Sequence, residues 1–283
     1  MSDLLEEQLI KDIESQLDDI NDIERVLVLS DLHIPFHKEK EIIDIIKDNS
    51  NVHTIILAGD IIDCFSVSTF PKERHIPLYQ ELKTASTLLK KIDKLTPNIQ
   101  KIVFRGNHEF RFKRYLAKFQ SEFSPLVSDD ILEILKNGFT YRDNNNNIKR
   151  TVEPLSDNYK IIDSWYYIYH DLVLAHPTSF SKLPMRTCVS TYDYFKNQGV
   201  DFKALAIGHT HKAGTLIHGG TLLCELGCLC NQMNYANNGN VNYTPQTNGY
   251  GLFVFHKDKV DIYNSGTKFL YTGSDVNGKT LNN

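Results

Sequence analysis

The residues most able to do chemistry stand in short polar clusters that each follow an apolar run. His209 and His211 come after the apolar run 204–207 and Gly208, two residues apart. Residues i and i+2 of an extended chain lie on the same side, so both imidazoles can approach one point. A polar turn with two surface histidines explains this pattern equally well. The pair indicates a metal site only if partners occur elsewhere in the chain.

Four other apolar runs end in the same kinds of side chain. The groups that follow them are Asp31 and His33, Asp60 and Asp63, Asn107, His108 and Glu109, and His176. In open α/β sheets ligands bind at the carboxyl ends of the strands, so five such endings predict one shared site. Carboxylate, imidazole and amide donors without thiolate suit Mn, Fe, Zn, Ni or Co better than calcium.

These donors are too many for one metal ion. Two ions about 3.5–4 Å apart, bridged by one carboxylate, would use them all. Such a pair lowers the pKa of a shared water, and the resulting hydroxide can attack phosphorus in line while the cations stabilise charge on the other oxygens. The pattern therefore favours hydrolysis of a phosphoester with two divalent transition-metal ions, manganese being the favoured metal.

The elements that must position these residues alternate between strands and helices. Apolar runs at 25–30, 54–59 and 101–106 predict strands, and residues 39–48 and 78–94 have helical periodicity. This order predicts a parallel core with helices outside. The second half is richer in strands, with a hairpin at 165–175. Helices are further expected at 109–136 and 187–198, and strands near 203–207, 213–218, 221–226, 250–256 and 259–263.

The five polar clusters together resemble the calcineurin-like metallophosphoesterases, in the right order from about residue 25 to 263. The resemblance implies an α/β fold, a four-layer α/β/β/α sandwich. It implies that Asp31, His33 and His211 hold one metal ion and that Asp60 bridges. It implies that Asn107, His176 and His209 hold the second ion. His108 would protonate the leaving oxygen, with Glu109 and Asp63 as further catalytic residues around it.

Within that family the chain is similar to a subgroup often met in bacteriophage genomes. The similarity lies in the opening DLHIPFH of residues 31–37 and in ELGCLC at 225–230, followed by NGYG at 248–251. Pro177 follows His176 where glycine is common. Cys64 follows Asp63 where the protein serine/threonine phosphatases usually carry Arg-Gly, which weighs against that branch although the segment 105–109 resembles it.

These features favour a phosphodiesterase or nuclease that acts on nucleic acid or a nucleotide. A phosphomonoesterase acting on a protein or a small molecule is the alternative, and an inactive scaffold is a remote one. Arg111 and His37 are candidate substrate contacts, although Arg111 and Arg114 could equally form the solvated face of a helix. Asp63 could orient a metal ligand or simply cap a helix, and Glu109 could hold His108 or begin the next helix.

Composition sets the remaining expectations. The 283 residues are 41% hydrophobic and 23% charged with a net charge of −4, an ordinary globular balance without a general attraction for nucleic acid. No signal peptide and no apolar run of about 20 residues is seen, so we expect a cytoplasmic protein, in the host cytoplasm if phage-encoded, without membrane association. The cysteines at 224, 228 and 230 are expected to be buried strand thiols. An amphipathic helix at 1–24 precedes the domain at 25–283 and could support a homo-oligomer.

Overall fold

The computed structural model describes residues 23–270 except 73, 128, 144, 147 and 234–245. The helix expected at the N-terminus lies outside this part of the chain, apart from Ile23 and Glu24, which begin the first strand. Within the described residues, no helix combines the length and the apolar character that crossing a bilayer requires.

The first sheet has a parallel core extended by antiparallel strands. Four strands run parallel in the order β1 (Ile23–Leu29), β2 (Thr54–Ala58), β3 (Gln100–Phe104) and β6 (Tyr159–Ile162). On the other side of β1 lies β12 (Gly249–His256), which pairs with β1, β13 (Lys259–Val260) and β14 (Gly266–Phe269), all antiparallel. The helices α2 (Glu39–Asp48) and α3 (Leu78–Leu95) connect the first three strands, as the sequence predicts.

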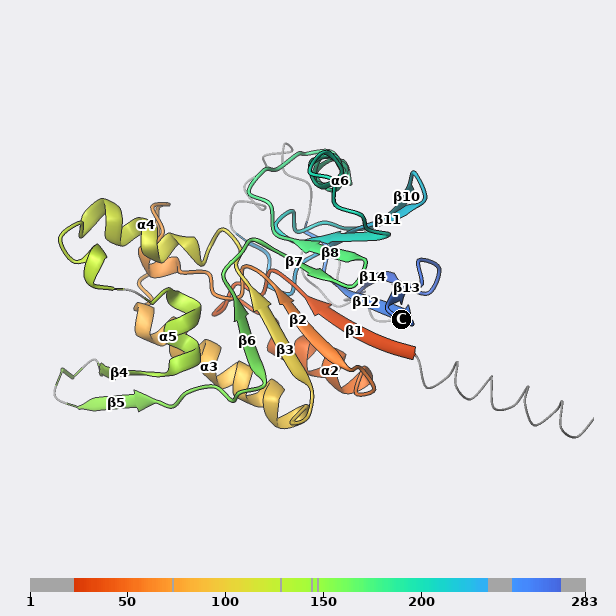
Figure 1. The fold of residues 1–283 in the computed structure, drawn as a ribbon. Coiled ribbons are helices and arrows are strands. Elements are labelled where there is room, and N and C mark those ends of the chain that lie inside the picture. Colours follow the sequence, from red (N-terminus) through yellow and green to blue (C-terminus); the bar gives the residue numbers. More distant parts are fainter. Residues whose placement is uncertain are drawn as a thin grey trace, which may run out of the picture.

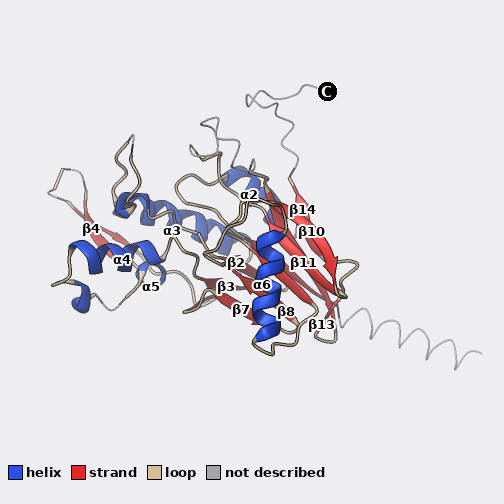
Figure 2. Ribbon diagram, turned by 90° about the horizontal axis from the view of Figure 1, so that it is seen from above, coloured by secondary structure: helices blue, strands red, loops and turns tan. Residues whose placement is uncertain are grey.

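The second sheet contains the strands of the second half. Its order is β10 (Ala213–His218), β11 (Thr221–Leu226), β9 (Ala204–Ile207), β8 (Leu172–Ala175) and β7 (Tyr166–Tyr169). The strands β8, β9 and β11 are parallel, and β7 and β8 form the predicted hairpin. The helix α6 (Arg186–Asn197) lies over the outer face of this sheet (Figure 2).

The alternation of side chains along the strands produces three apolar cores and four layers. Leu27 and Leu29 of β1 face α2 and α3, whereas Val26 and Val28 face the second sheet. The third core lies between the second sheet and α6. Figure 1 shows the two sheets side by side with α2 and α3 on one side and α6 on the other. The mixed α/β, four-layer α/β/β/α sandwich is therefore confirmed.

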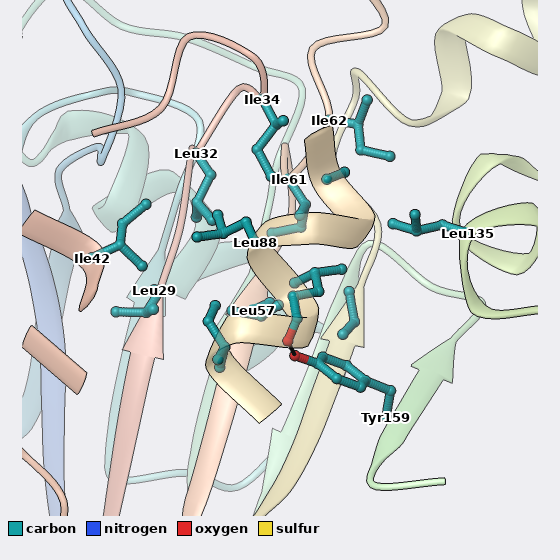
Figure 3. Close-up of a cluster of buried hydrophobic side chains, with 14 of the residues drawn as sticks. Leu29, Leu32, Ile34, Ile42, Leu57, Ile61, Ile62, Leu88, Leu135 and Tyr159 are labelled. Carbon is teal, nitrogen blue, oxygen red and sulfur yellow. Dashed lines mark hydrogen bonds between the residues drawn. The ribbon is translucent and has the colours of Figure 1, made fainter. Parts of the chain in front are cut away.

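The first of these cores fixes the helices against the sheet. Leu29 and Leu57 from the strands and Leu88 from α3 belong to it and are buried, as Figure 3 shows. Tyr159 of β6 lies at its edge and donates a hydrogen bond to the Leu89 carbonyl over 2.7 Å. This buried phenol thereby ties the last strand of the parallel core to the helix above it.

The helix expected at 109–136 is wrong as a single element. The chain forms α4 (Phe110–Phe119), a short 3-10 turn (Ser124–Leu126) and α5 (Ile131–Asn137). The break follows from local chemistry, because Pro125 lies in the turn and Asp130 accepts hydrogen bonds from the Leu132 and Glu133 amides as the N-cap of a new helix.

Further strands were not expected from the sequence. One such element is an antiparallel pair of β4 (Phe139–Arg142) and β5 (Lys149–Val152). The strands β6 and β14 were also missed, and the strand expected at 259–263 is limited to Lys259–Val260. These strands are short, so their sequence patterns are weak.

Candidate metal centre

The carboxyl ends of the parallel strands meet at one place between the two sheets. Backbone hydrogen bonds join the segments that follow them. The Asp31 amide donates to the Gly59 carbonyl over 3.2 Å, and the His33 amide donates to the Asp60 carbonyl over 2.9 Å. The Gly208 amide donates to the Ala175 carbonyl over 3.1 Å. The loops after β1 and β2 therefore run together, and those after β8 and β9 do the same.

The backbone at this edge is held in an unusual conformation. Asp31, His33, Asp60, His209 and His211 all have positive φ angles, of 54°, 47°, 52°, 76° and 54°. Left-handed backbone at a residue other than glycine costs about 1–3 kcal/mol and persists only where surrounding contacts enforce it. Such strain clusters at functional sites, and here it turns successive polar side chains toward a common point.

Two glycines allow these side chains to come close. A Cβ atom on Gly106 would lie 2.2 Å from Asp60 Oδ1, and one on Gly208 would lie 2.1 Å from Ser30 Oγ. Neither approach is sterically possible. The glycines that precede Asn107 and His209 are thus required by the packing of the site, and any side chain there would displace its acids.

A first group of donors surrounds Asp31. Asp31 Oδ1 lies 3.2 Å from His211 Nε2 and 3.7 Å from His33 Nε2, and the two Nε2 atoms are 2.9 Å apart. His33 Nδ1 lies 2.9 Å from Asp63 Oδ1. If Nδ1 donates its proton to that carboxylate, the lone pair of His33 Nε2 points at the centre of the group. Asp63 thus orients His33 from behind.

A second group of donors surrounds Asp60. Ligand atoms of Asp60, His176 and His209 lie within 4.8 Å of one another. His176 Nε2 is 3.1 Å from Asp60 Oδ2, and His176 Nδ1 contacts the Ala58 carbonyl at 2.8 Å, which fixes the ring. Asp60 Oδ2 is also 3.8 Å from His33 Nε2 in the first group. One carboxylate oxygen therefore faces both groups, as a bridging ligand must.

The charges of the centre are strongly coupled. Burial alone would raise the pKa of Asp31, but His176 and then His211 and His33 hold it well below its usual range. Burial alone would lower the pKa of His176, but Asp60 and Asp31 raise it to about 9. Burial and the neighbouring His176 lower the pKa of His209 to about 4. The buried carboxylates thus attract positive charge, which a proton or a metal ion can supply.

The unpaired atoms of the centre test whether a metal ion fits. Among the described residues, Asn107 Oδ1 is buried and has no hydrogen-bond partner, and the buried His176 Nε2 faces the carboxylate oxygen Asp60 Oδ2 at 3.1 Å without a hydrogen bond of good geometry. A buried acceptor without a partner costs about 1–3 kcal/mol, so each such atom needs an explanation. A divalent cation provides one, because amide oxygen, carboxylate oxygen and imidazole nitrogen are all ligands for it. The two groups could therefore hold metal ions.

His108 lies beside the two groups with its ring 13% exposed. Its Nδ1 atom is 3.0 Å from both the carboxylate and the carbonyl oxygen of Asp63, and its Nε2 atom is 3.7 Å from Asp60 Oδ2. The guanidinium of Arg111 lies 2.7 Å from the same Nε2 atom and 3.0 Å from the Asp63 carbonyl. Burial first, and then His33 and Arg111, lower the pKa of His108 against the opposing effect of Asp60.

The predicted site residues lie in different places around this centre. Of the two candidate substrate contacts, Arg111 lies against His108. The ring of His37 is only 6% exposed, and its Nε2 atom lies 3.8 Å from Glu39 Oε2. Arg114 donates to the Asn107 carbonyl over 3.1 Å. The Nε2 atom of His170 lies 3.0 Å from Glu24 Oε2, away from this centre.

The carboxylate of Glu109 binds the backbone of another loop, whereas one of the two expectations was that it would hold the ring of His108. Its buried carboxylate accepts hydrogen bonds from four backbone amides, those of Asp60, Ile61, Ile62 and Gly106, at 2.7–3.1 Å. It therefore holds the loop that carries Asp60. Burial and the neighbouring Asp60 raise the pKa of Glu109 to about 7, against the amide hydrogen bonds.

Two further residues at the centre were missed by the sequence reasoning. Ser30 Oγ donates to Asp31 Oδ2 over 2.6 Å and so fixes the carboxylate. The side-chain nitrogen of Gln246 lies 2.5 Å from His211 Nδ1. Ser30 could have been found from its position beside Asp31, but nothing in the local sequence marks Gln246.

The side chain of Arg105 is only 2% exposed and forms ion pairs with Asp130 and Asp163. Because Asp130 is the N-cap of α5, this pairing anchors that helix.

Sequence comparison places the chain in a family. Residues 24–213 match the family described as calcineurin-like phosphoesterase, and this match spans more than half of the chain. The protein therefore belongs to the calcineurin-like phosphoesterases, and it is a metal-dependent phosphoric ester hydrolase. No curated protein is significantly similar to it in sequence.

Several solved structures are similar to the chain at low identity. A novel archaeal phosphodiesterase has 14% identity and a TM-score of 0.36, with 87% of this chain and 99% of that one covered. Vacuolar protein sorting 29 from Cryptosporidium parvum has 14% identity, a TM-score of 0.40 and coverages of 88% and 98%. A metallophosphoesterase from Sphaerobacter thermophilus has 14% identity, a TM-score of 0.39 and coverages of 87% and 88%.

The role of Glu109 in holding the loop can be tested by Glu109→Gln. The substitution turns a donor toward backbone amides that already need acceptors, so the free energy of unfolding should fall by about 2–4 kcal/mol. Chemical denaturation at about pH 8, above the pKa of Glu109, measures this difference. The exposed Glu122→Gln is the matched control and should change stability by less than about 0.5 kcal/mol. Equal stability of the two variants would refute the role.

Proposed function

We propose that this phosphoesterase cleaves phosphodiesters of nucleic acid or of a nucleotide. Two divalent transition-metal ions would be held by the two donor groups. The first would be bound by Asp31, His33 and His211 and the second by Asn107, His176 and His209, with Asp60 between them. Manganese, iron, zinc, nickel and cobalt all suit such oxygen and nitrogen donors. When bound, the ions would lower the pKa of a coordinated water and neutralise charge on the phosphate.

A basic and aromatic rim beside His108 is the observation that carries the substrate class. We define the rim by Phe36, Phe65, Phe70, Lys72, Arg74 and Arg111. Each cation lies over a ring, with Arg74 5.0 Å from the centre of Phe36, Lys72 5.9 Å from Phe65 and Arg111 5.9 Å from Phe70.

The rim is joined to the centre at both ends. The Phe36 amide donates to the His33 carbonyl over 2.7 Å, and Arg111 contacts His108. Phe70 is 69% exposed, so its ring is accessible to a ligand. Cations that follow a phosphate backbone and exposed rings that stack on bases are the features of single-strand binding. With a net charge of −4, the chain has no general attraction for nucleic acid, so this local cluster supplies it.

A cavity that reaches the centre at His176 can take part of the substrate. It has a volume of about 400 Å³ and reaches His176. Phe110, Trp165 and Tyr194 supply aromatic walls, and the hydroxyl groups come from Thr178, Ser179, Ser190 and Thr191. Its size is within the range of small-molecule sites, and the mixture of rings and hydroxyl groups suits a nucleoside. Trp165 also stacks on Phe195 of α6 at a distance of 5.5 Å between ring centres, so only part of the Trp165 ring is available to a ligand.

His108 is proposed to donate a proton to the leaving oxygen. In the free protein Arg111 faces its Nε2 atom and disfavours protonation there. A phosphate bound between the rim and the centre would draw the guanidinium to its own oxygens, because Arg binds phosphate with paired hydrogen bonds. That movement would let His108 take up the proton, while Asp63 holds its Nδ1 atom in place.

The substrate class is tested by turnover of bis-p-nitrophenyl phosphate against p-nitrophenyl phosphate, with Mn²⁺, Ni²⁺ or Zn²⁺. We expect the diester to have a kcat/KM about tenfold higher or more. A single-stranded oligonucleotide should also be cleaved, and Lys72→Gln with Arg74→Gln should slow that cleavage while leaving bis-p-nitrophenyl phosphate unaffected. A strong preference for the monoester would instead establish a phosphomonoesterase.

The proton-donor role of His108 is tested by His108→Ala. Turnover of a dinucleotide, whose alkoxide leaves poorly, should fall by about 10²–10⁴-fold because no group protonates that oxygen. Turnover of bis-p-nitrophenyl phosphate should fall less, since nitrophenolate leaves without a proton. Metal content, measured by atomic spectrometry, should be unchanged. Full activity of the variant on the dinucleotide would rule out the role.

The link between Arg111 and His108 predicts a shift in the pH profile. The guanidinium lowers the pKa of His108, so Arg111→Gln should raise it. A general acid must be protonated, and a higher pKa keeps it protonated to higher pH. The alkaline limb of the kcat/KM profile should therefore move upward. Arg114→Gln, which removes an equal charge from the same helix, should leave the limb in place, and an unmoved limb in Arg111→Gln would disprove the link.

A further inference from the structure

A sulfur atom lies beside the first donor group. Cys230 Sγ and ring nitrogens of His33 and His211 lie within 4.8 Å of one another. Cys230 is 1% exposed, and its thiol is free. These are the same two imidazoles whose Nε2 atoms face each other at 2.9 Å beside Asp31. The sulfur therefore lies beside both imidazoles of the first donor group.

The backbone that positions Asp31 and His33 also positions this sulfur. The Leu229 amide donates to the Asp31 carbonyl over 3.1 Å, and the Lys38 amide donates to the Leu229 carbonyl over 2.9 Å. His37 and Cys230 form an isolated antiparallel bridge. Because Leu229 and Cys230 pair with the loop after β1, the backbone holds the thiol beside His33.

The neighbouring cysteine, Cys228, is hydrogen-bonded to Cys230 but lies outside the donor group. Cys228 Sγ accepts from Asn248 Nδ2 at 3.5 Å, and its backbone bridges Asn248, so it faces the segment before β12. It belongs to none of the donor groups formed by the described residues. The side-chain nitrogen of Gln246 lies 3.7 Å from both sulfurs and 2.5 Å from His211. A histidine that binds a metal ion through Nε2 carries its proton on Nδ1, so a flip of the Gln246 amide that presents its oxygen to Nδ1 would orient His211 as a ligand.

We propose that Cys230 is a ligand of the first metal ion, together with Asp31, His33, Asp60 and His211. The thiol loses its proton to solvent when the sulfur–metal bond forms, since a coordinating thiol is deprotonated. A thiolate is a softer ligand than carboxylate or imidazole and favours zinc, iron or cobalt over manganese or magnesium. The ligands of the first metal ion would thus include a sulfur, whereas the sequence motifs predict only oxygen and nitrogen donors.

The Co²⁺-loaded protein tests the proposal by its absorption. A thiolate bound to Co²⁺ gives a near-ultraviolet charge-transfer band that oxygen and nitrogen ligands do not give. We expect the band in the unmodified protein and in Cys228→Ser, and its loss in Cys230→Ser. The Kd for Co²⁺ should rise at least about tenfold in Cys230→Ser and should be nearly unchanged in Cys228→Ser. A band that is absent from the unmodified protein, or that persists in Cys230→Ser, overturns the proposal.

X-ray absorption of the Zn²⁺-loaded protein gives an answer that needs no variant. A sulfur at about 2.3 Å from zinc is expected, whereas ligands at about 2.0–2.2 Å alone would overturn the proposal. Neither measurement depends on the substrate. A protein that shows the sulfur but prefers the monoester would disprove only the proposed diesterase function, and one that cleaves diesters without the sulfur would disprove only the ligand.

Discussion

The burial of two carboxylates at one point is the constraint on which the rest of the structure depends. Asp31 and Asp60 are 0% and 1% exposed, and an isolated buried carboxylate loses several kcal/mol of hydration. The imidazoles around the two carboxylates recover part of this free energy, and the same attraction to Asp60 and Asp31 raises the pKa of His176 to about 9. The positive φ angles and the crowded glycines persist because these attractions hold them. Such a centre stabilises a bound cation strongly.

The fold meets this constraint by using strand ends from two sheets. Parallel strands deliver their carboxyl ends to the same edge, so β1, β2 and β3 bring the acids and His108 while β8 and β9 bring His176, His209 and His211. A single sheet edge would leave one side of the carboxylates open to water. Packing two sheets face to face closes that side, and the apolar core between them excludes water from below the centre.

Much of this could be predicted because the signals are local. Asp31, Asp60, Asn107, His176 and His209 each follow an apolar run within a few residues, so the strand and its functional end are read together. The partners of Glu109 could not be predicted, because it contacts a loop 47–49 residues away. Gln246 and Cys230 approach His211 and His33 only through tertiary packing. Short strands such as β14 depend on pairing with β12 more than on their own pattern.

The charge of the centre connects the metal ligands with the choice of substrate. Two divalent ions exceed the charge of Asp31 and Asp60, so a centre built from these acids and neutral histidines would be strongly positive and would favour the dianion of a monoester. A thiolate from Cys230 would remove one positive charge from the first position. The less positive centre would then match the single negative charge of a phosphodiester, and in the proposed function Arg111 and the other cations of the rim would attract the phosphates on either side of the cleaved bond. A sulfur ligand and a diester substrate are therefore consistent on electrostatic grounds.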